Sequence, residues 1–155
     1  MISRTCESLE KAKNYCFLLL KFRPRSEYEI RERLKRKKFD EPIIKAVLAF
    51  LKEKNFIDDE AFTQAWVDFR LKRPFGLRRI AQELRIKGID KDIVAQVLEK
   101  TKQVYSEREA VVKIAKERLN RLKGIEPQTA KRRTLAYLLR RGFSPDAIID
   151  ALEQL

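Results

Sequence analysis

The side chains in this sequence that could do chemistry are mainly cations, and they are unusually numerous. Of the 155 residues, 36 are Lys or Arg and 23 are Asp or Glu, so the formal net charge is +13. Ammonium and guanidinium groups bind phosphates and carboxylates, and a guanidinium binds either one through two parallel hydrogen bonds. A positive charge of this size therefore indicates a polyanionic partner.

The positive charge is concentrated in three stretches of the chain. Residues 21–38 hold nine Lys or Arg against three Glu, residues 70–87 hold seven against one, and residues 131–141 hold five against none. The net charges of +6, +6 and +5 together exceed the total, so the remaining residues are acidic on balance. Cations on merely solvated faces have no reason to gather in this way, and we interpret the three stretches as one extended basic surface.

The sequence offers little for catalysis or metal binding. It contains no histidine, the commonest general base, and no Cys-x-x-Cys pair. Nearly all carboxylates stand at helical spacing from a Lys or Arg, as on solvated helix surfaces. Cys6 and Cys16 are ten residues apart, and Cys16 lies in an apolar run that predicts a buried thiol. We therefore predict no catalytic, metal or cofactor site and a protein that is not an enzyme.

The elements that must position the cations are helices that repeat along the chain. Residues 71–98 have the apolar spacing of two amphipathic helices joined by a tight turn. Gly88 is suited to end the first helix with a positive φ, and Asp90 is suited to cap the second. The same pattern recurs 50 residues earlier and, more weakly, 54 residues later. A helical pattern with this period predicts a repeat architecture.

We therefore predict an all-α fold, an elongated array of three tandem three-helix repeats over residues 1–55, 56–104 and 105–155. One helix of each repeat carries the basic stretch. The aromatic row of Phe62, Trp66 and Phe69 has the spacing of a core-facing stripe. No apolar run is long enough to span a membrane and no secretory signal is recognisable, so we expect a cytoplasmic protein. We also expect it to be a monomer.

Helix caps and ion pairs follow from the local sequence. Ser26 and Glu29 have the spacing of a capping box at the start of a helix from Glu27. Three pairs of residues four apart predict ion pairs on that helix: Glu27 with Arg31, Glu29 with Arg33 and Glu32 with Arg36. In the middle repeat, Arg79 and Lys87 are predicted to pair with Glu83. The third basic helix has no internal acid, so its arginines are predicted to be free of helical neighbours.

Twelve cations are the candidate contacts for a partner, four from each basic stretch. They are Arg25, Arg31, Lys35 and Lys37 in the first, Arg78, Arg79, Arg85 and Lys87 in the second, and Arg132, Arg133, Arg140 and Arg141 in the third.

Three segments resemble the signature segments of the RecX family of bacterial recombination regulators. They are residues 23–27 (RPRSE), residues 56–62 (FIDDEAF) and Gly76 followed by residues 83–89 (ELRIKGI). Two departures occur at turns, because Lys38 and Asn55 stand where the family has glycine. Asn tolerates the left-handed conformation that such a turn requires.

The resemblance implies a function in DNA repair, recombination and the SOS response. A RecX protein is expected to be cytosolic and non-enzymatic, and to bind the RecA filament on single-stranded DNA along its helical groove. It is expected to inhibit the ATPase, strand-exchange and coprotease activities of RecA.

A helix-turn-helix DNA-binding regulator is the alternative, because two short helices joined by a turn recur in the sequence. A recognition helix needs side chains that read base edges, whereas these helices present mostly Lys and Arg, which suit phosphates. We therefore favour a filament modulator whose own binding to single-stranded DNA is weak and sequence-tolerant.

Overall fold

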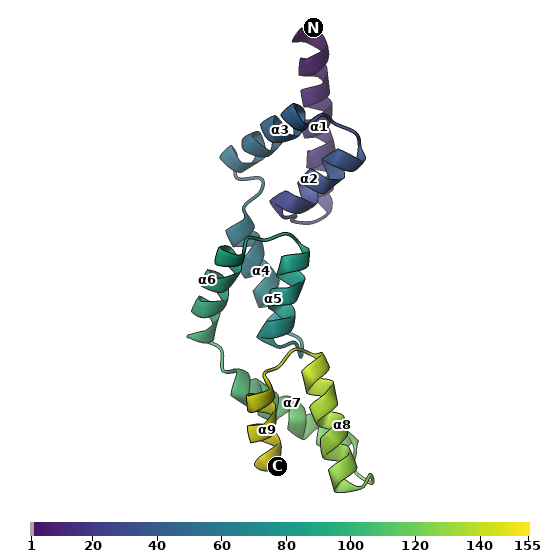
Figure 1. Cartoon of the computed structure of the whole chain (residues 1–155), viewed down its shortest axis with the longest axis vertical. Helices are drawn as coiled ribbons and strands as arrows, with labels where there is room; N and C mark the ends of the chain where they lie inside the picture. Colours follow the sequence, from purple (N-terminus) through teal and green to yellow (C-terminus); the bar gives the residue numbers. More distant parts are fainter. Residues whose placement is uncertain (1) are drawn as a thin grey trace. The chain divides into compact units, whose positions relative to one another are not determined.

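The computed structural model describes residues 2–155, with side chains from Arg4 onward. These residues form nine α-helices and no strand, which confirms the all-α tandem-repeat fold (Figure 1). In chain order the helices are α1 (Ile2–Phe22), α2 (Glu27–Arg36), α3 (Glu41–Glu53), α4 (Asp59–Leu71), α5 (Leu77–Ile86), α6 (Lys91–Lys102), α7 (Glu107–Arg121), α8 (Pro127–Arg140) and α9 (Pro145–Glu153).

The described residues form two compact units. The first holds the residues up to Ala65 together with Leu84–Ile93, and the second holds Trp66–Glu83 and Val94–Leu155. The borders fall inside α4, α5 and α6, so each of these helices contributes to both units. The repeat limits near residues 55 and 104 stay a prediction.

The core of the first unit lies among α1, α2 and α3. It is built from the apolar stripes that the sequence predicted, including Ile30 and Leu34 of α2 and Ile44 and Val47 of α3. Cys16 is fully buried among them, as predicted. Burial raises the pKa of its thiol to about 11, so this cysteine is a protonated packing group at neutral pH.

The second helix of each repeat ends in the same turn. After α2, α5 and α8 the residues Lys38, Gly88 and Gly142 have φ values of 61°, 71° and 83°. The next residue then donates its N–H to a carbonyl five positions back, as Phe143 does to Leu138 at 3.3 Å. This is the Schellman arrangement. Lys38 thus takes the left-handed conformation although, unlike glycine, it has a side chain that disfavours it. Asn55, with φ of 57°, takes the same conformation after α3.

The cap predicted at the start of α2 forms, and a second side-chain cap lies near the start of α4. The Ser26 hydroxyl accepts the N–H of Glu29 at 3.1 Å, and the Glu29 carboxylate accepts the N–H of Ser26 at 3.3 Å, so the capping box is confirmed. Asp58 accepts the N–H of Ala61 at 3.0 Å, close to the start of α4. These bonds satisfy helix N–H groups that have no partner inside the helix.

In the second unit, a glycine contact joins the α4–α5 loop to the α8–α9 turn. The N–H of Gly76 donates to the carbonyl of Arg141 at 2.8 Å. A Cβ atom on Gly76 would lie 2.2 Å from the carbonyl oxygen of Gly142, so only glycine permits this approach. The core beneath is shared by α7, α8 and α9, with Leu138 and Phe143 almost completely buried.

The aromatic row of α4 is only partly core, which corrects the sequence prediction. Phe62 is buried and Trp66 is half-buried, but Phe69 is 49% exposed. The stripe on α4 is therefore narrower than the row of aromatic residues. Among the helices that the structure describes, none combines the length and apolar character needed to cross a membrane.

Candidate functional site

The first basic stretch forms a shallow cationic cleft of about 210 Å³ between the α1–α2 loop and α2. Its lining includes Arg23, Arg25, Arg33 and Arg36. Arg25 is half-buried, and burial followed by the charges of Arg23 and Arg33 lowers its pKa. Mutual repulsion of this kind would be relieved by an anion bound in the cleft.

The ion pairs predicted inside α2 are wrong. Glu27 pairs with Lys52 of α3 at 3.1 Å and Glu32 pairs with Lys35 at 3.5 Å. Arg31 pairs with Glu41 of α3. A pair four residues apart on an exposed helix contributes only about 0.2–0.5 kcal/mol, so neighbours from other elements readily replace it.

The corrected pairing changes which cations of α2 are available. Among the described residues, no ion pair engages Arg33 or Arg36, which sequence reasoning had assigned to glutamates. Both are exposed and both line the cleft beside Arg25. Lys35 and Arg31, two of the predicted contacts, are instead paired with acids, and Lys37 lies 5.3 Å from the Tyr15 ring.

Glu29 is the centre of the first unit's polar network. It accepts Arg23 at 2.9 Å and the ammonium group of Lys87 at 3.2 Å. The Ser26 hydroxyl in turn donates to the carbonyl of Lys87 at 2.6 Å. Lys87 pairs with Glu29, a partner that the sequence did not predict, because the turn after α5 lies against the start of α2. A partner 58 residues away leaves no local trace in the sequence.

Glu83 collects the cations of the second unit. It pairs with Arg79 at 3.2 Å, as predicted, and with Arg70 of α4. The Trp66 indole N–H also donates to it at 3.1 Å. Burial alone would raise the pKa of Glu83, but the hydrogen bonds from Arg70, Arg79 and Trp66 outweigh burial and lower it. Arg79 is thus partly neutralised by a carboxylate.

Phe75 orders three guanidinium groups from different elements. Arg70 lies 3.8 Å, Arg141 4.8 Å and Arg79 5.9 Å from the centre of its ring. Arg141 also lies 5.1 Å from the ring of Tyr137, one helical turn earlier, which corrects the prediction that it is free of helical neighbours. Each such contact contributes about 0.5–1 kcal/mol at an exposed site. Cations from the second and third basic stretches therefore meet around one aromatic ring.

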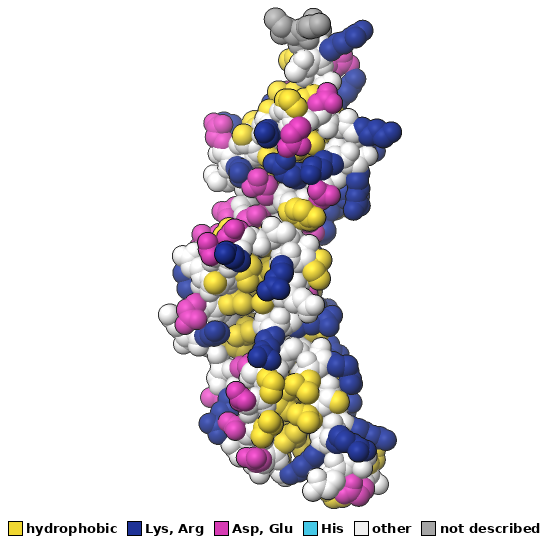
Figure 2. Space-filling view, in the orientation of Figure 1, with side chains coloured by type: hydrophobic (Ala, Val, Ile, Leu, Met, Phe, Trp, Pro, Cys, Tyr) yellow, Lys and Arg dark blue, Asp and Glu magenta, His cyan; other side chains and the backbone are white. Residues whose placement is uncertain are grey.

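The remaining predicted contacts are exposed. In α5 these are Arg78 and Arg85, and in α8 they are Arg132, Arg133 and Arg140. No ion pair engages them among the residues that the structure describes. Lys and Arg side chains are prominent on α8 in the space-filling view (Figure 2). The nearest acid to the start of α8 is Glu126, whose carboxylate caps the helix by accepting the N–H groups of Gln128 and Thr129.

Within residues 4–155, no cluster of three or more His, Cys, Asp or Glu is arranged to hold a metal ion. The arrangement that the residues do offer is a set of guanidinium and ammonium groups on helix surfaces. Such groups bind phosphate and carboxylate through charge-assisted hydrogen bonds.

Family models match nearly the whole chain in three consecutive segments. Residues 12–51 match "RecX, first three-helix domain", residues 58–98 match the second and residues 106–152 match the third. Regulatory protein RecX of Amycolatopsis mediterranei is 37% identical over 139 residues, which cover 88% of this chain and 78% of that protein. Regulatory protein RecX of Pasteurella multocida is 31% identical, with 94% of this chain and 92% of that protein covered.

Solved structures share the fold. The crystal structure of RecX from Lactobacillus salivarius superposes with a TM-score of 0.84 and 23% sequence identity, and the match covers 97% of each chain. A second crystal structure of regulatory protein RecX gives a TM-score of 0.81 at 22% identity, over 98% of this chain and 74% of that one.

Proposed function

The chain belongs to the RecX family, and we propose that it inhibits the RecA recombinase by binding along the RecA filament on single-stranded DNA. The observation that carries the proposal is the match to all three RecX domains in order across residues 12–152. We propose further that the protein acts in the cytoplasm as a monomer and without catalysing a reaction of its own.

The distribution of charge supports contact with both components of such a filament. Arg132 and Arg133 of α8 are exposed, so they can reach DNA phosphates, neutralise them and release counterions. Arg141, ordered beside Phe75, keeps a fixed geometry that suits a carboxylate on a protein surface. Ordering a guanidinium beforehand lowers the entropy lost on binding.

The test follows ATP hydrolysis by RecA filaments preformed on single-stranded DNA as the purified chain is added. We expect equimolar or smaller amounts of the chain to slow hydrolysis, while the chain alone hydrolyses neither nucleotide nor DNA. An unrelated ATPase in the same coupled assay controls for interference with the readout. Unchanged hydrolysis in the presence of excess folded protein would contradict the proposal.

A further inference from the structure

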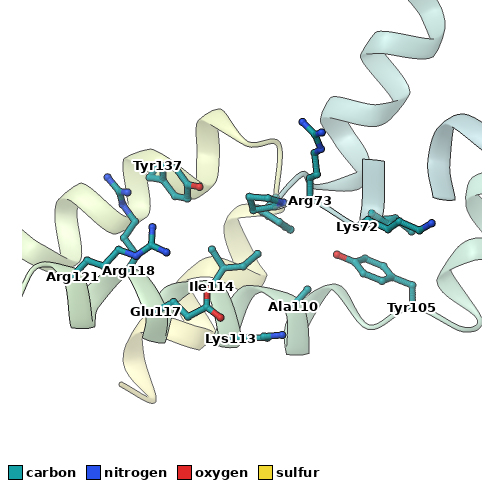
Figure 3. A pocket seen from close by; sticks show the side chains of 13 residues that line it. Lys72, Arg73, Tyr105, Ala110, Lys113, Ile114, Glu117, Arg118, Arg121 and Tyr137 are labelled. Atoms are coloured by element: carbon teal, nitrogen blue, oxygen red, sulfur yellow. The ribbon is translucent and has the colours of Figure 1, made fainter. Parts of the chain in front are cut away.

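The second unit contains a cleft of about 450 Å³ that the predicted basic contacts do not line. Its walls come from the end of α4 and the loop after it, from one face of α7, and from Tyr137 and Phe143 (Figure 3). This volume lies within the range of sites that bind small ligands or single protein side chains.

The cleft has an apolar patch in its middle, at Ala110 and Ile114, with Lys113 and Glu117 beside it, and cations at both ends. Ile114 of α7 projects into the middle, between Tyr105 and Tyr137 (Figure 3). Lys72 and Arg73 stand at the Tyr105 end, and Arg118 and Arg121 stand at the Tyr137 end. Five of the lining residues are Lys or Arg, and Glu117 is the one acid among them. An occupant must therefore offer an apolar group between two anionic ones.

One donor in this lining has no partner. The Nε atom of Arg118 is buried and makes no hydrogen bond among the described residues. A buried donor without an acceptor is unfavourable, so Arg118 would gain a hydrogen bond by turning its guanidinium toward a carboxylate bound at this end of the cleft. The hydroxyl of Tyr105 points toward the cleft at the opposite end (Figure 3).

The Tyr137 ring does not suit nucleobase binding. A base stacks on an open aromatic face, but the Tyr137 ring already has the Arg118 guanidinium at 4.0 Å and the Arg141 guanidinium at 5.1 Å. These features favour a protein side chain over a nucleotide.

We propose that this cleft binds a peptide segment in which one bulky apolar side chain is flanked on both sides by carboxylates. The apolar side chain would cover Ile114, one carboxylate would accept from Arg118 and Arg121, and the other would pair with Lys72. Burial of an anchor side chain supplies affinity and the surrounding charges supply specificity. The inference rests on the proposed function and deepens it, because it gives the chemistry of the partner segment that binds in the cleft.

The test uses the full chain and a fluorescein-labelled synthetic peptide, with a central phenylalanine between two clusters of glutamate, followed by fluorescence anisotropy. We expect glutamine in place of the glutamates, or alanine in place of the phenylalanine, to weaken binding by about tenfold or more. Lys72→Glu combined with Arg121→Glu should weaken it equally, because these exposed cations line the cleft and each is assigned to one of the two carboxylates.

The matched control is Lys116→Glu combined with Arg108→Glu. These two exposed cations belong to α7, lie outside the cleft, and give the same change in net charge. Binding by this control should stay within about threefold of wild type. Circular dichroism and thermal melting establish that each variant is folded, and Arg121→Gln provides a milder second variant.

Three results would overturn the inference. They are absence of peptide binding by the wild-type chain, equal weakening by the control variant, and unchanged binding of the glutamine peptide. If unlabelled oligothymidylate displaces the peptide from the wild-type chain, and the cleft variant no longer binds oligothymidylate, the cleft is assigned to nucleic acid instead. The peptide assay contains no RecA, so the two proposals can fail separately. If the chain binds the peptide but does not slow RecA, only the proposed function is overturned. If the chain slows RecA but does not bind the peptide, only this inference is overturned.

Discussion

Two glutamates hold cations that would otherwise be free. Glu29 joins Arg23 to Lys87 in the first unit, and Glu83 joins Arg70 to Arg79 in the second. Both carboxylates have a lowered pKa, because hydrogen bonds from their cationic partners outweigh the effect of burial. A conspicuously basic protein thus uses some of its few acids to organise its cations, which leaves fewer available for a partner than the sequence count suggests.

Glu83→Gln tests this role at the residue scale. We expect the substitution to lower the free energy of unfolding by about 1–3 kcal/mol at pH 7, because a charged acceptor of several hydrogen bonds is lost. The folded pKa lies below the ordinary 4.5, so the contribution is complete above that value and is lost as the pH falls through the lower, folded pKa. Urea unfolding from pH 7 to pH 3 measures it.

The control for this pH series is Glu99→Gln. The Glu99 side chain is 70% exposed and pairs only with Lys102 at 3.5 Å among the described residues, so its removal should cost less than about 0.5 kcal/mol. A difference between wild type and Glu83→Gln that stays constant from pH 7 to pH 3 would contradict the argument.

At the scale of the element, local sequence carried most of the information that the fold required. The capping box at Ser26 was predictable because its donors and acceptors lie within four residues of one another. The turn at Lys38 was predictable from its place in the repeat pattern. The partner of Lys87 was not, because Glu29 lies 58 residues away and several nearer acids were equally plausible. The sequence therefore predicts helices and turns well, but it predicts the ion pairs between them poorly.

The same limit applies to the candidate site. Exposed arginines of α8 could be identified because that helix has no acid of its own. The grouping of Arg70, Arg79 and Arg141 around Phe75 could not, because it depends on the contact between Gly76 and Gly142. No spacing rule links a loop after one helix to a turn after another.

The turn at Lys38 provides a prediction at this scale. A side chain at φ of 61° costs about 1–2 kcal/mol, and glycine removes that cost while increasing the entropy of the unfolded chain. Lys38→Gly should therefore raise the free energy of unfolding by about 0.5–1 kcal/mol. Urea unfolding monitored by circular dichroism would measure the change.

Lys37→Gly is the matched control for Lys38→Gly. It removes the same charge one residue earlier, where φ is −81° and no relief is available. We expect it to lower the free energy of unfolding by about 0.5–1 kcal/mol. Equal effects of the two substitutions would show that charge, and not backbone conformation, decides the stability of this turn.

For the whole molecule, the net charge of +13 determines the affinity and the salt dependence with which the chain binds nucleic acid in the absence of RecA. Exposed Lys and Arg without a base-reading set should bind single-stranded DNA weakly and with little sequence preference. If about six phosphates are neutralised, the logarithm of the binding constant should fall with the logarithm of salt concentration with a slope of about −4. Fluorescence anisotropy of labelled oligonucleotides from 50 to 200 mM salt measures this slope.

A duplex of one sequence that binds about a thousandfold more tightly than random DNA would contradict this expectation. It would favour the helix-turn-helix alternative, because such a ratio requires contacts to base edges. A random duplex of equal length and a homopolymeric single strand are the controls, measured at the same salt concentration.

The helices of the basic surface should contribute unequally to filament binding. Lys87 is held by Glu29 and Arg79 by Glu83, whereas Arg132 and Arg133 form no ion pair among the residues described. Reversing the two α8 charges should therefore weaken filament affinity by about tenfold or more. Their side chains are exposed, so the stability of the fold should change by only about 0.5 kcal/mol per site.

Two comparison variants make the ranking decisive, with filament affinity measured by co-sedimentation and folding by thermal melting. Arg78→Glu with Arg85→Glu reverses two exposed cations of α5 and should weaken binding less than Arg132→Glu with Arg133→Glu. Lys45→Glu with Lys54→Glu reverses two exposed cations outside the three basic stretches and should have the smallest effect. If the α8 variant is folded and binds like wild type, the basic surface does not extend to α8, and the third repeat serves to support the other two.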